Sequence, residues 1–235
     1  KMSQLINVER VGVWLSNKDD GTICNFAQFD QQNGHYKSNI ILDQSSSTIY
    51  FDLLNSHRTI PITDIYNDIR VVELLPFYKE HAKDVIALLD APIITSSGVK
   101  GVLCCESFST REWTSQEQLL VGTFADMVAI VLERMERLEV EQELKKIAFY
   151  DRLTGLPNQN SFSGFVNERI EASPSIPFYI VYIRIDKFEY MQDVLGYEYG
   201  EILVKDAASR LQRIKREEDF IARVGNHHFV LVFDC

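Results

Sequence analysis

The feature that most constrains the fold is a stretch from Ser115 to Tyr150 that contains no proline. Thr114 precedes it and Glu117 follows three residues later, which is the capping-box pattern that begins a helix. A helix of roughly 35 residues spans about 50 Å at 1.5 Å per residue, which is too long for one face of a small domain. The stretch therefore predicts one long helix that connects two domains.

Apolar residues of this helix recur at alternating spacings of three and four, the pattern of a coiled-coil seam. They are Val121, Phe124, Val128, Val131, Met135 and Leu138, and the seam turns polar at Gln142 and Lys145. In one interpretation the first half packs on a sheet or on a partner's copy, and the second half links the domains as a parallel homodimer. In the other, the second half is a solvated linker that does not pair.

Before this helix, apolar runs alternate with turn signals. VGVWLSN (11–17) and TICNFAQF (22–29) predict two strands around an Asp-Asp-Gly turn, and SSSTIYFDLLNS (45–56) predicts a helix capped by serine. VIALLDAPIIT (85–95) and VKGVLCCESF (99–108) predict two strands joined by a Ser-Ser-Gly turn. The expected unit is an antiparallel sheet with helices, an α+β unit.

After the helix a second α+β domain is expected. DRLTGLPN (151–158) is a loop, and SFSGFVNERIEA (161–172) and ILVKDAASRLQRIK (202–215) predict helices. FYIVYIRI (178–185) predicts a strand buried on both faces, because its apolar run is continuous. RVGNHHFVLVF (223–233) predicts a hairpin with a tight turn at Gly225 and Asn226.

Charge and cysteine content exclude several classes of function. The net charge of -10 argues against binding to nucleic acid or to an anionic membrane surface. No apolar run approaches the length of a membrane span, and the N-terminus is unlike a signal peptide, so any anchor would lie outside this chain, which we expect to be cytoplasmic. Neighbouring Cys104 and Cys105 should point to opposite faces of a strand rather than pair. No cofactor is expected.

Residues from about Ala148 onward resemble the GGDEF domain of diguanylate cyclases, which join two GTP molecules into cyclic di-GMP. Three motifs in order carry this resemblance: DRLTGLPN (151–158), IRIDKFEYMQDVLGYEYGEILVKDAASRL (183–211) and REEDFIARVGNHHFVLVF (216–233). Residues 1 to about 135 resemble a GAF domain, a small-molecule sensing module, in ERVGVWL (9–15), IPITDI (60–65), GVLCCES (101–107) and REWTSQEQ (111–118).

These resemblances imply an α+β chain: a GAF-type antiparallel sheet with flanking helices, a long connecting helix, and the N-terminal part of a GGDEF α/β domain. The expected bounds are 1–134 for the GAF domain with the start of its exit helix, 135–147 for the connecting helix and 148–235 for the partial GGDEF domain. Further strands of that domain would follow Cys235.

The resemblance places non-acidic residues where the family binds metal. Two divalent cations hold the triphosphate in the family and need carboxylates at a strand end and in the GGDEF turn. The matching positions are Arg184, His227 and His228, and Asn226 replaces the second glycine. Neighbouring residues on a strand point apart, so the two histidines should not share an ion. The implied domain is catalytically inactive and binds no metal.

Nucleotide-reading positions have also changed relative to the family. Gln192 and Glu201 stand for the asparagine and aspartate that contact guanine, and Tyr197 stands for a histidine. Glu189 replaces the lysine that follows the family's phenylalanine, here Phe188. Together with Gly225, the positions that would contact nucleotide are Phe188, Gln192, Tyr197 and Glu201.

Two further sites are candidates. Arg216 and Asp219 match the family's RxxD inhibitory site for cyclic di-GMP, although they also fit an ordinary charged helix end. Tyr66, Arg70, Phe77 and Tyr78 could line a GAF pocket over an anionic or cyclic-nucleotide ligand. The alternatives are that they are core and lid residues, or that an empty GAF domain serves only dimerisation.

The function implied is a regulatory module of a bacterial cyclic di-GMP signalling protein. In it a GAF sensor is coupled through a helix to an inactive GGDEF domain, upstream of an EAL phosphodiesterase domain that would hold any enzymatic activity. Cyclic di-GMP or GTP could act as a regulator. The alternative is an active diguanylate cyclase that uses Mg²⁺ and GTP with Asp186 as its remaining strand-end carboxylate.

Overall fold

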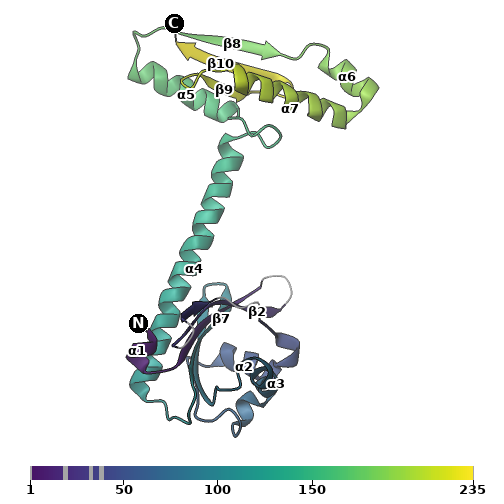
Figure 1. Ribbon diagram of the computed structural model, residues 1–235. Helices are drawn as coiled ribbons and strands as arrows, with labels where there is room; N and C mark the ends of the chain where they lie inside the picture. The colour runs from purple at the N-terminus through teal and green to yellow at the C-terminus, as the bar shows by residue number, and fades with distance from the viewer. Residues whose placement is uncertain (1, 18–20, 32–33, 37–39, 235) are drawn as a thin grey trace. The chain divides into compact units, whose positions relative to one another are not determined.

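A computed structural model describes residues 2–17, 21–31, 34–36 and 40–234 (Figure 1). The chain divides into two compact units, Lys1–Glu136 and Arg137–Cys235. Helix α4 (Ser115–Phe149) is continuous and has residues in both units, as its lack of proline predicts. The mixture of sheets and helices confirms the α+β class. None of the described helices is long and apolar enough to cross a membrane.

The first unit is built on one antiparallel sheet. Its strands lie in the order β3-β2-β1-β7-β6-β5, with β4 paired to β2. The strands are β1 (Arg10–Ser16), β2 (Thr22–Asp30), β3 (Gly34–Tyr36), β4 (Ile41–Asp43), β5 (Ile60–Ile62), β6 (Ala87–Thr95) and β7 (Gly98–Ser107). Both predicted strand pairs form, β1 with β2 and β6 with β7. Of the first predicted turn, residues 18–20 lie outside the described residues.

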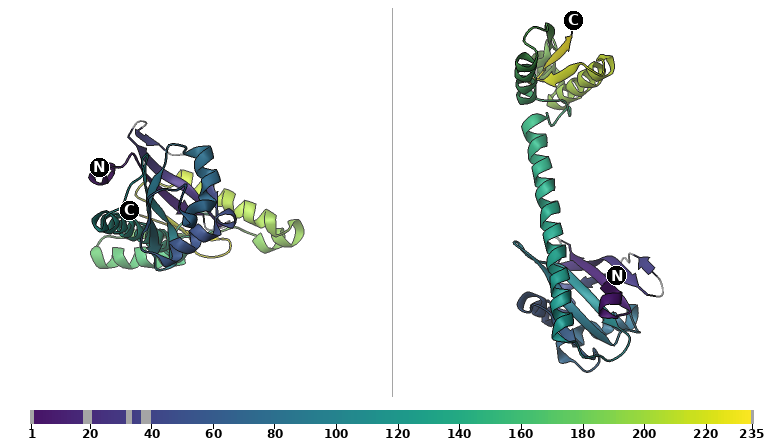
Figure 2. Two further views of the ribbon diagram at one scale, coloured as in Figure 1. Left: turned by 90° about the horizontal axis from the view of Figure 1, so that it is seen from below. Right: turned by 90° about the vertical axis from the view of Figure 1, so that its left-hand side faces the viewer.

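Helices cover both faces of this sheet (Figures 1 and 2). One face carries α2 (Thr48–Ser56), η2 (Ile69–Leu74) and α3 (Leu75–His81), which bury a core around Tyr50, Leu54 and Tyr78. The other carries α1 (Met2–Ile6) and the first half of α4. Cys104 belongs to the first core and Cys105 to the second, so the two thiols point to opposite faces as expected.

The first half of α4 packs on its own sheet, which decides between two of the sequence-based alternatives. Val121, Ala125 and Ala129 are buried in the second core, and Phe124 and Val128 are half-buried against it. The remaining seam residues lie at the surface: Val131 is 56% exposed, Met135 53% and Leu138 40%.

The sequence predicted the N-terminal cap of α4 correctly but not that of α2. At α4 the capping box forms, because Thr114 N and Oγ1 donate to Glu117 Oε2 at 2.8 and 2.9 Å. At α2 the expected serine cap is wrong, because Ser47 makes no side-chain cap. Glu73 of η2 takes its place and accepts from Ile49 N at 2.8 Å. A long-range carboxylate therefore caps this helix.

The second unit has a three-stranded antiparallel sheet in the order β8-β10-β9. Its elements after α4 are α5 (Gln159–Ala172), β8 (Phe178–Arg184), α6 (Phe188–Leu195), α7 (Tyr197–Ile214), β9 (Phe220–Arg223) and β10 (His228–Asp234). The predicted hairpin is formed by β9 and β10, and its core includes Leu156, Phe188 and Phe229.

Burial of β8 on both faces was wrongly predicted. Tyr179 and Tyr182 are 55% and 62% exposed, and Ile180 and Val181 are 47% and 41% exposed. β8 pairs along one edge with β10, and no other described strand pairs with it. A continuous apolar run shows that a strand would be stabilised by burial on both faces. Whether it is buried depends on which other elements pack against it.

Candidate functional site

The hairpin turn of the second unit brings basic groups together. His228 begins β10 and lies opposite Arg184 at the end of β8. His227 stacks on the Phe188 ring with centroids 4.9 Å apart. The two imidazoles are also close, with centroids 4.1 Å apart, so the expectation that they point apart is wrong. The reason is that His227 lies in the turn before β10, where strand alternation does not hold.

His227 is buried and only 7% exposed, and its Nδ1 has no hydrogen-bond partner. Burial lowers the pKa of His227, and positive charge on His228 and Arg184 lowers it further. Its nearest acid is Glu189, whose Oε1 lies 3.9 Å from Nε2. Burial and the neighbouring positive charge both favour the neutral form of the imidazole.

The donor set at this turn does not fit Mg²⁺, which requires oxygen ligands in near-octahedral geometry. Arg184 occupies the strand end, and its guanidinium lies 3.9 Å from Asp186, a carboxylate that is 80% exposed. Within the described part of the chain, no three His, Cys, Asp or Glu side chains come together in a way that could hold a metal ion. At these positions Arg184, His227 and His228 offer a divalent cation no oxygen ligand.

A small cavity lies beside this turn. It has a volume of about 80 Å³ and is lined by Leu153, Phe188, Gln192, Tyr197, Gly200, Glu201, Val204, Arg223 and Asn226. Four of the predicted nucleotide positions thus meet at one cavity, while Gly225 does not line it. Ligand pockets usually measure about 300–1,000 Å³. Gln192 packs so closely on Gly200 that a Cβ there would lie 2.5 Å from its Nε2.

Arg223 joins this turn to the loop after α4. Its Nη1 donates to both carboxylate oxygens of Asp151 at 2.9 Å, and its Nε donates to Gly225 O at 3.1 Å. Nη2 reaches Asn226 O at 2.5 Å. Burial would raise the pKa of Asp151, but hydrogen bonds from Thr154 and Arg223 outweigh it and lower the pKa. One side chain thus fixes the turn relative to the loop.

The same loop is fastened to the last carbonyls of α4. Asn158 caps α5 by accepting from Asn160 N and Ser161 N, and its Nδ2 donates to Ala148 O at 2.9 Å. Ser161 Oγ donates to Phe149 O. Because the last carbonyls of a helix lack partners within it, these bonds complete the C-terminus of α4.

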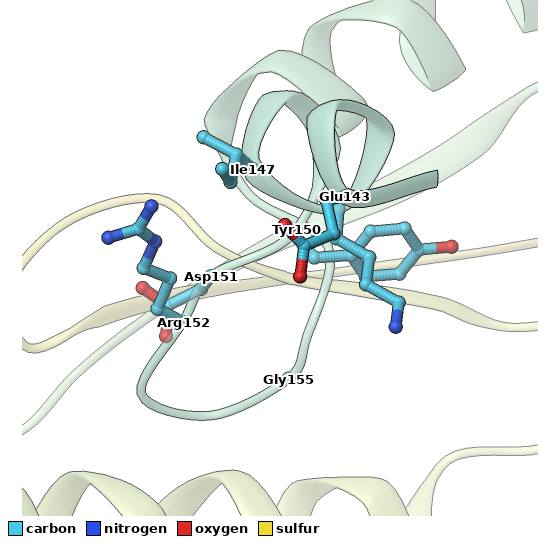
Figure 3. Close-up of a pocket in the computed structure, with 7 residues that line it drawn as sticks. Glu143, Ile147, Tyr150, Asp151, Arg152 and Gly155 are labelled. Atoms are coloured by element: carbon cyan, nitrogen blue, oxygen red, sulfur yellow. The ribbon is translucent and has the colours of Figure 1, made fainter. Parts of the chain in front are cut away.

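A wider hollow of the second unit lies where α4 meets this loop (Figure 3). It has a volume of about 650 Å³, and Glu143, Lys146, Ile147, Tyr150, Asp151, Arg152 and Gly155 line it. Ile147 and Tyr150 are about half exposed. The Asp151 carboxylate is already bound by Arg223. None of the residues predicted to contact nucleotide lies here.

Arg216 and Asp219 lie at the turn after α7. Asp219 Oδ2 accepts from the Arg216 backbone N–H at 2.8 Å, and Asp219 Oδ1 is buried with no partner. The Arg216 side chain is exposed. The aspartate therefore shapes the turn while the arginine extends into solvent.

The first unit contains a cavity of about 20 Å³ under α2 and α3. Its lining residues are Trp14, Ile23, Leu42, Tyr50, Leu74, Phe77, Tyr78, Val102, Cys104 and Glu106. Phe77 and Tyr78 are thus at the cavity, but Tyr66 and Arg70 are not among the lining residues. Arg70 is held elsewhere, by the Asp68 carboxylate and by Pro61 O at 2.9 Å.

Buried acids adjoin this cavity, and the sequence patterns did not single them out. Tyr50 Oη donates to Asp90 Oδ2 at 2.5 Å, and Tyr78 Oη lies 3.4 Å from Glu106 Oε1. Burial raises the pKa of Asp90 to about 7 and also raises that of Glu106. The one available signal was a charged residue inside each of two apolar strands, DAPII and VLCCE.

Comparison with known proteins assigns both units to families. The model of the GAF domain matches residues 1–132, and that of the diguanylate cyclase GGDEF domain matches residues 148–234. Diguanylate cyclase DgcP of Escherichia coli (strain K12) is 24% identical over 155 residues, covering 63% of this chain and 46% of DgcP. The bifunctional diguanylate cyclase/cyclic di-GMP phosphodiesterase MucR of Pseudomonas aeruginosa is 30% identical over 96 residues, covering 40% and 14%.

Among solved structures, the coiled coil and GGDEF domain of DgcB from Caulobacter crescentus in complex with c-di-GMP is similar to this chain. The identity is 26% and the TM-score 0.43, over 49% of this chain and 60% of that one. The chain spans less than half the length of the curated relatives described.

Proposed function

Because the chain belongs to the GAF domain family over residues 1–132 and carries a GGDEF domain over residues 148–234, we propose that it is a sensing and transmitting module of cyclic di-GMP signalling whose GGDEF domain makes no cyclic di-GMP. In this proposal, a ligand that binds the first unit shifts α4 between two arrangements. The change in α4 then alters the arrangement of the second unit.

The observation that carries it is the charge at the metal positions. Arg184 and His228 are Cα partners across β8 and β10, where the family's chemistry needs carboxylates. An arginine repels a divalent cation, and a neutral imidazole such as His227 is a poor ligand for Mg²⁺. The adjacent cavity of about 80 Å³ is also small for a purine nucleotide.

The attachment of α4 within each unit supports a transmitting role. In the first unit Arg58 forms a bidentate pair with Asp126, and Ser96 N donates to Glu133 Oε1 at 2.6 Å. In the second unit Asn158 and Ser161 bind the last carbonyls of the helix. A helix that is held by hydrogen bonds within both units can transmit a conformational change in one unit to the other.

Four finer statements belong to the same proposal. The chain acts as a homodimer through α4, it is cytoplasmic, and an EAL phosphodiesterase domain follows in the full-length protein. The exposed Arg216 binds a phosphate of cyclic di-GMP through its guanidinium group. Alternatively, GTP binds near the β9–β10 hairpin turn and acts as the regulator. The name of MucR, which combines cyclase and phosphodiesterase, supports the third statement by analogy.

The direct test is incubation of the purified chain with GTP and either Mg²⁺ or Mn²⁺, with the products separated by liquid chromatography and identified by mass. We expect no cyclic di-GMP, while a diguanylate cyclase run in parallel converts its GTP. Formation of cyclic di-GMP would favour the alternative, an active enzyme that relies on Asp186.

A matched variant tests whether charge is the cause. Arg184→Asp combined with Asn226→Gly, His227→Asp and His228→Glu rebuilds the acidic turn. We expect this variant to gain Mg²⁺-dependent binding of GTP that the parent chain lacks. If the parent binds Mg²⁺ with GTP equally well, the charge argument is wrong.

A further inference from the structure

The hollow where α4 meets the following loop is large enough to hold a ligand. Its volume of about 650 Å³ lies within the range of about 300–1,000 Å³ that is usual for ligand pockets. The cavities beside the hairpin turn and in the first unit measure only about 80 and 20 Å³. Every residue that lines the hollow falls between Glu143 and Gly155, so the site belongs to the second unit alone.

Backbone hydrogen bonds hold the walls of this hollow in place. Asp151 N donates to Leu156 O at 2.8 Å, and Gly155 N donates to Asp151 O at 2.8 Å. Asn158 N donates to Phe149 O at 2.9 Å and ties the loop to the last turn of α4. A pocket whose walls are already ordered loses little conformational entropy when a ligand binds.

Gly155 leaves one wall of the hollow without a side chain. Its φ of +70° is a backbone conformation that favours glycine. A Cβ at this position would meet no heavy atom of the described chain within 4 Å. The space beside the loop is therefore open to a ligand.

Part of the lining is apolar. Ile147 and Tyr150 are 50% and 49% exposed, and both line the hollow. Figure 3 shows these two side chains on α4, with Arg152 and Gly155 on the loop that follows. A flat ring that covers this surface removes apolar area from water, which stabilises the complex.

The hollow is also lined by two cationic side chains. Among the described residues, neither the Lys146 ammonium nor the Arg152 guanidinium has a hydrogen-bonding or ion-pairing partner. Of the two carboxylates that line the hollow, that of Asp151 is already bound by Arg223. Glu143 is then the one anion among the described lining residues to set against two cations, so the free charge is positive.

Positive groups of these two kinds fit a phosphate monoester. A phosphate monoester carries close to two negative charges at neutral pH and has three strong acceptor oxygens. A guanidinium can donate two parallel hydrogen bonds to phosphate, and an ammonium adds a point charge. An anion with a single charge would match only one of the two cations.

We propose that this hollow binds a phosphate monoester of an aromatic ring, with Lys146 and Arg152 at the phosphate and Ile147 and Tyr150 against the ring. The site goes beyond the proposed function, because it requires no ligand in the first unit and no chemistry at the hairpin turn. Its test is therefore independent of whether the chain makes cyclic di-GMP.

The site is compatible with pairing of two α4 helices. The seam of α4 turns polar at Gln142 and Lys145, and neither residue lines the hollow. The ligand and a second copy of the helix would thus use different residues of α4.

The test is isothermal titration calorimetry of the full chain with 1-naphthyl phosphate at neutral pH and low salt. We expect saturable binding of one molecule per chain. Inorganic phosphate, which lacks the ring, and 1-naphthol, which lacks the charge, should each bind at least about tenfold more weakly. No binding of 1-naphthyl phosphate, or equal binding of either of the other probes, would overturn the proposal.

Backbone amide chemical shifts of the nitrogen-15-labelled chain locate the ligand. The changes caused by 1-naphthyl phosphate should centre on residues 143–155. Changes centred on Phe188, Gln192 and Glu201 would place the ligand in the smaller cavity beside the hairpin turn and would contradict the proposal.

A pair of double variants tests the two cations. Lys146→Gln with Arg152→Gln should weaken binding of 1-naphthyl phosphate at least about tenfold. Lys205→Gln with Arg213→Gln removes the same charge from exposed positions on α7 and should change the affinity by less than about twofold. Far-UV circular dichroism establishes that both variants are folded. An equal loss in both would mean that only the overall charge matters, and the assigned site would be wrong.

A second pair of variants tests the contact with the ring. Ile147→Ser should weaken binding of 1-naphthyl phosphate about fivefold and leave the weak binding of inorganic phosphate unchanged. Ile214→Ser, at a residue of α7 that is 73% exposed, should affect neither ligand. Equal affinity of the Ile147→Ser variant and the parent chain for 1-naphthyl phosphate would contradict the assigned position of the ring.

Discussion

At the scale of single residues, Asp90 is an acidic group that the fold removes almost completely from water. It is 1% exposed in the middle of an apolar strand, and burial raises its pKa to about 7. The unfolded chain ionises this carboxyl near pH 4, whereas the folded chain keeps it protonated to about pH 7. The stability that Asp90 contributes is therefore complete below about pH 4 and is lost as the pH rises to about 7.

Asp90→Asn should remove this loss. We expect the variant to be more stable than the parent by roughly 4 kcal/mol at pH 8, and the two to converge near pH 4. Denaturant unfolding followed by tryptophan fluorescence measures this, because both tryptophans, Trp14 and Trp113, lie in the first unit. Asp52→Asn, at an exposed carboxylate on α2, is the matched control. A variant less stable than the parent at pH 8 would show that Asp90 is ionised and well compensated in the fold.

At the scale of elements, the pair of Asp151 and Arg223 holds the loop after α4 to the hairpin turn. The Arg223 side chain is 12% exposed and that of Asp151 23%, so solvent screens the pair only partly. The pKa of Asp151 is lowered, so its contribution is present above about pH 4 and is lost as the pH falls below that value.

Asp151→Asn should destabilise the second unit by roughly 1–3 kcal/mol at pH 7, because it removes the charge from two hydrogen bonds at 2.9 Å. The difference from the parent chain should shrink as the pH falls below about 4. Far-UV circular dichroism during urea unfolding measures it, since tryptophan emission reports the first unit. Asp193→Asn, an exposed residue of α6, should change stability little. An equal loss in both variants would mean that the pair contributes nothing specific.

Elements with strong local signals were predictable from the sequence. Helix α4 follows from the absence of proline and from the capping box of Thr114 and Glu117, and the β9–β10 hairpin follows from two apolar runs around Gly225. The cap of α2 was not predictable, because Glu73 lies 24 residues from the Ile49 backbone it binds. Such a contact depends on tertiary packing, which local propensity does not encode.

The hairpin turn of the second unit was predictable from the sequence, whereas the cavity of the first unit was not. The turn was recognisable because its motif residues are contiguous, from Gly225 to Phe229. The cavity of the first unit was not, because Tyr50, Asp90 and Glu106 come from three elements and meet only when the sheet forms. The exposure of β8 was mispredicted for the same reason: an apolar strand does not specify what covers it.

At the scale of the whole molecule, α4 is the one element with residues in both units. Its first half is used by the first unit through Val121, Ala125 and Ala129. Large apolar side chains further along remain exposed, and a seam of this kind is costly to leave in water. A second copy of the same helix is the partner that its spacing of three and four favours.

We therefore expect the chain to dimerise through Val131, Met135 and Leu138, and the triple variant that changes each to glutamine to be monomeric. Glutamine keeps helix propensity while removing apolar area, so α4 should persist in circular dichroism. Sedimentation velocity over a range of concentrations measures the mass. Ile130→Gln with Val140→Gln, two exposed apolar residues of α4 off the seam, should leave the dimer intact. A monomeric parent chain at tens of micromolar, or a triple variant that still dimerises, would favour the interpretation in which the second half of α4 is a solvated linker.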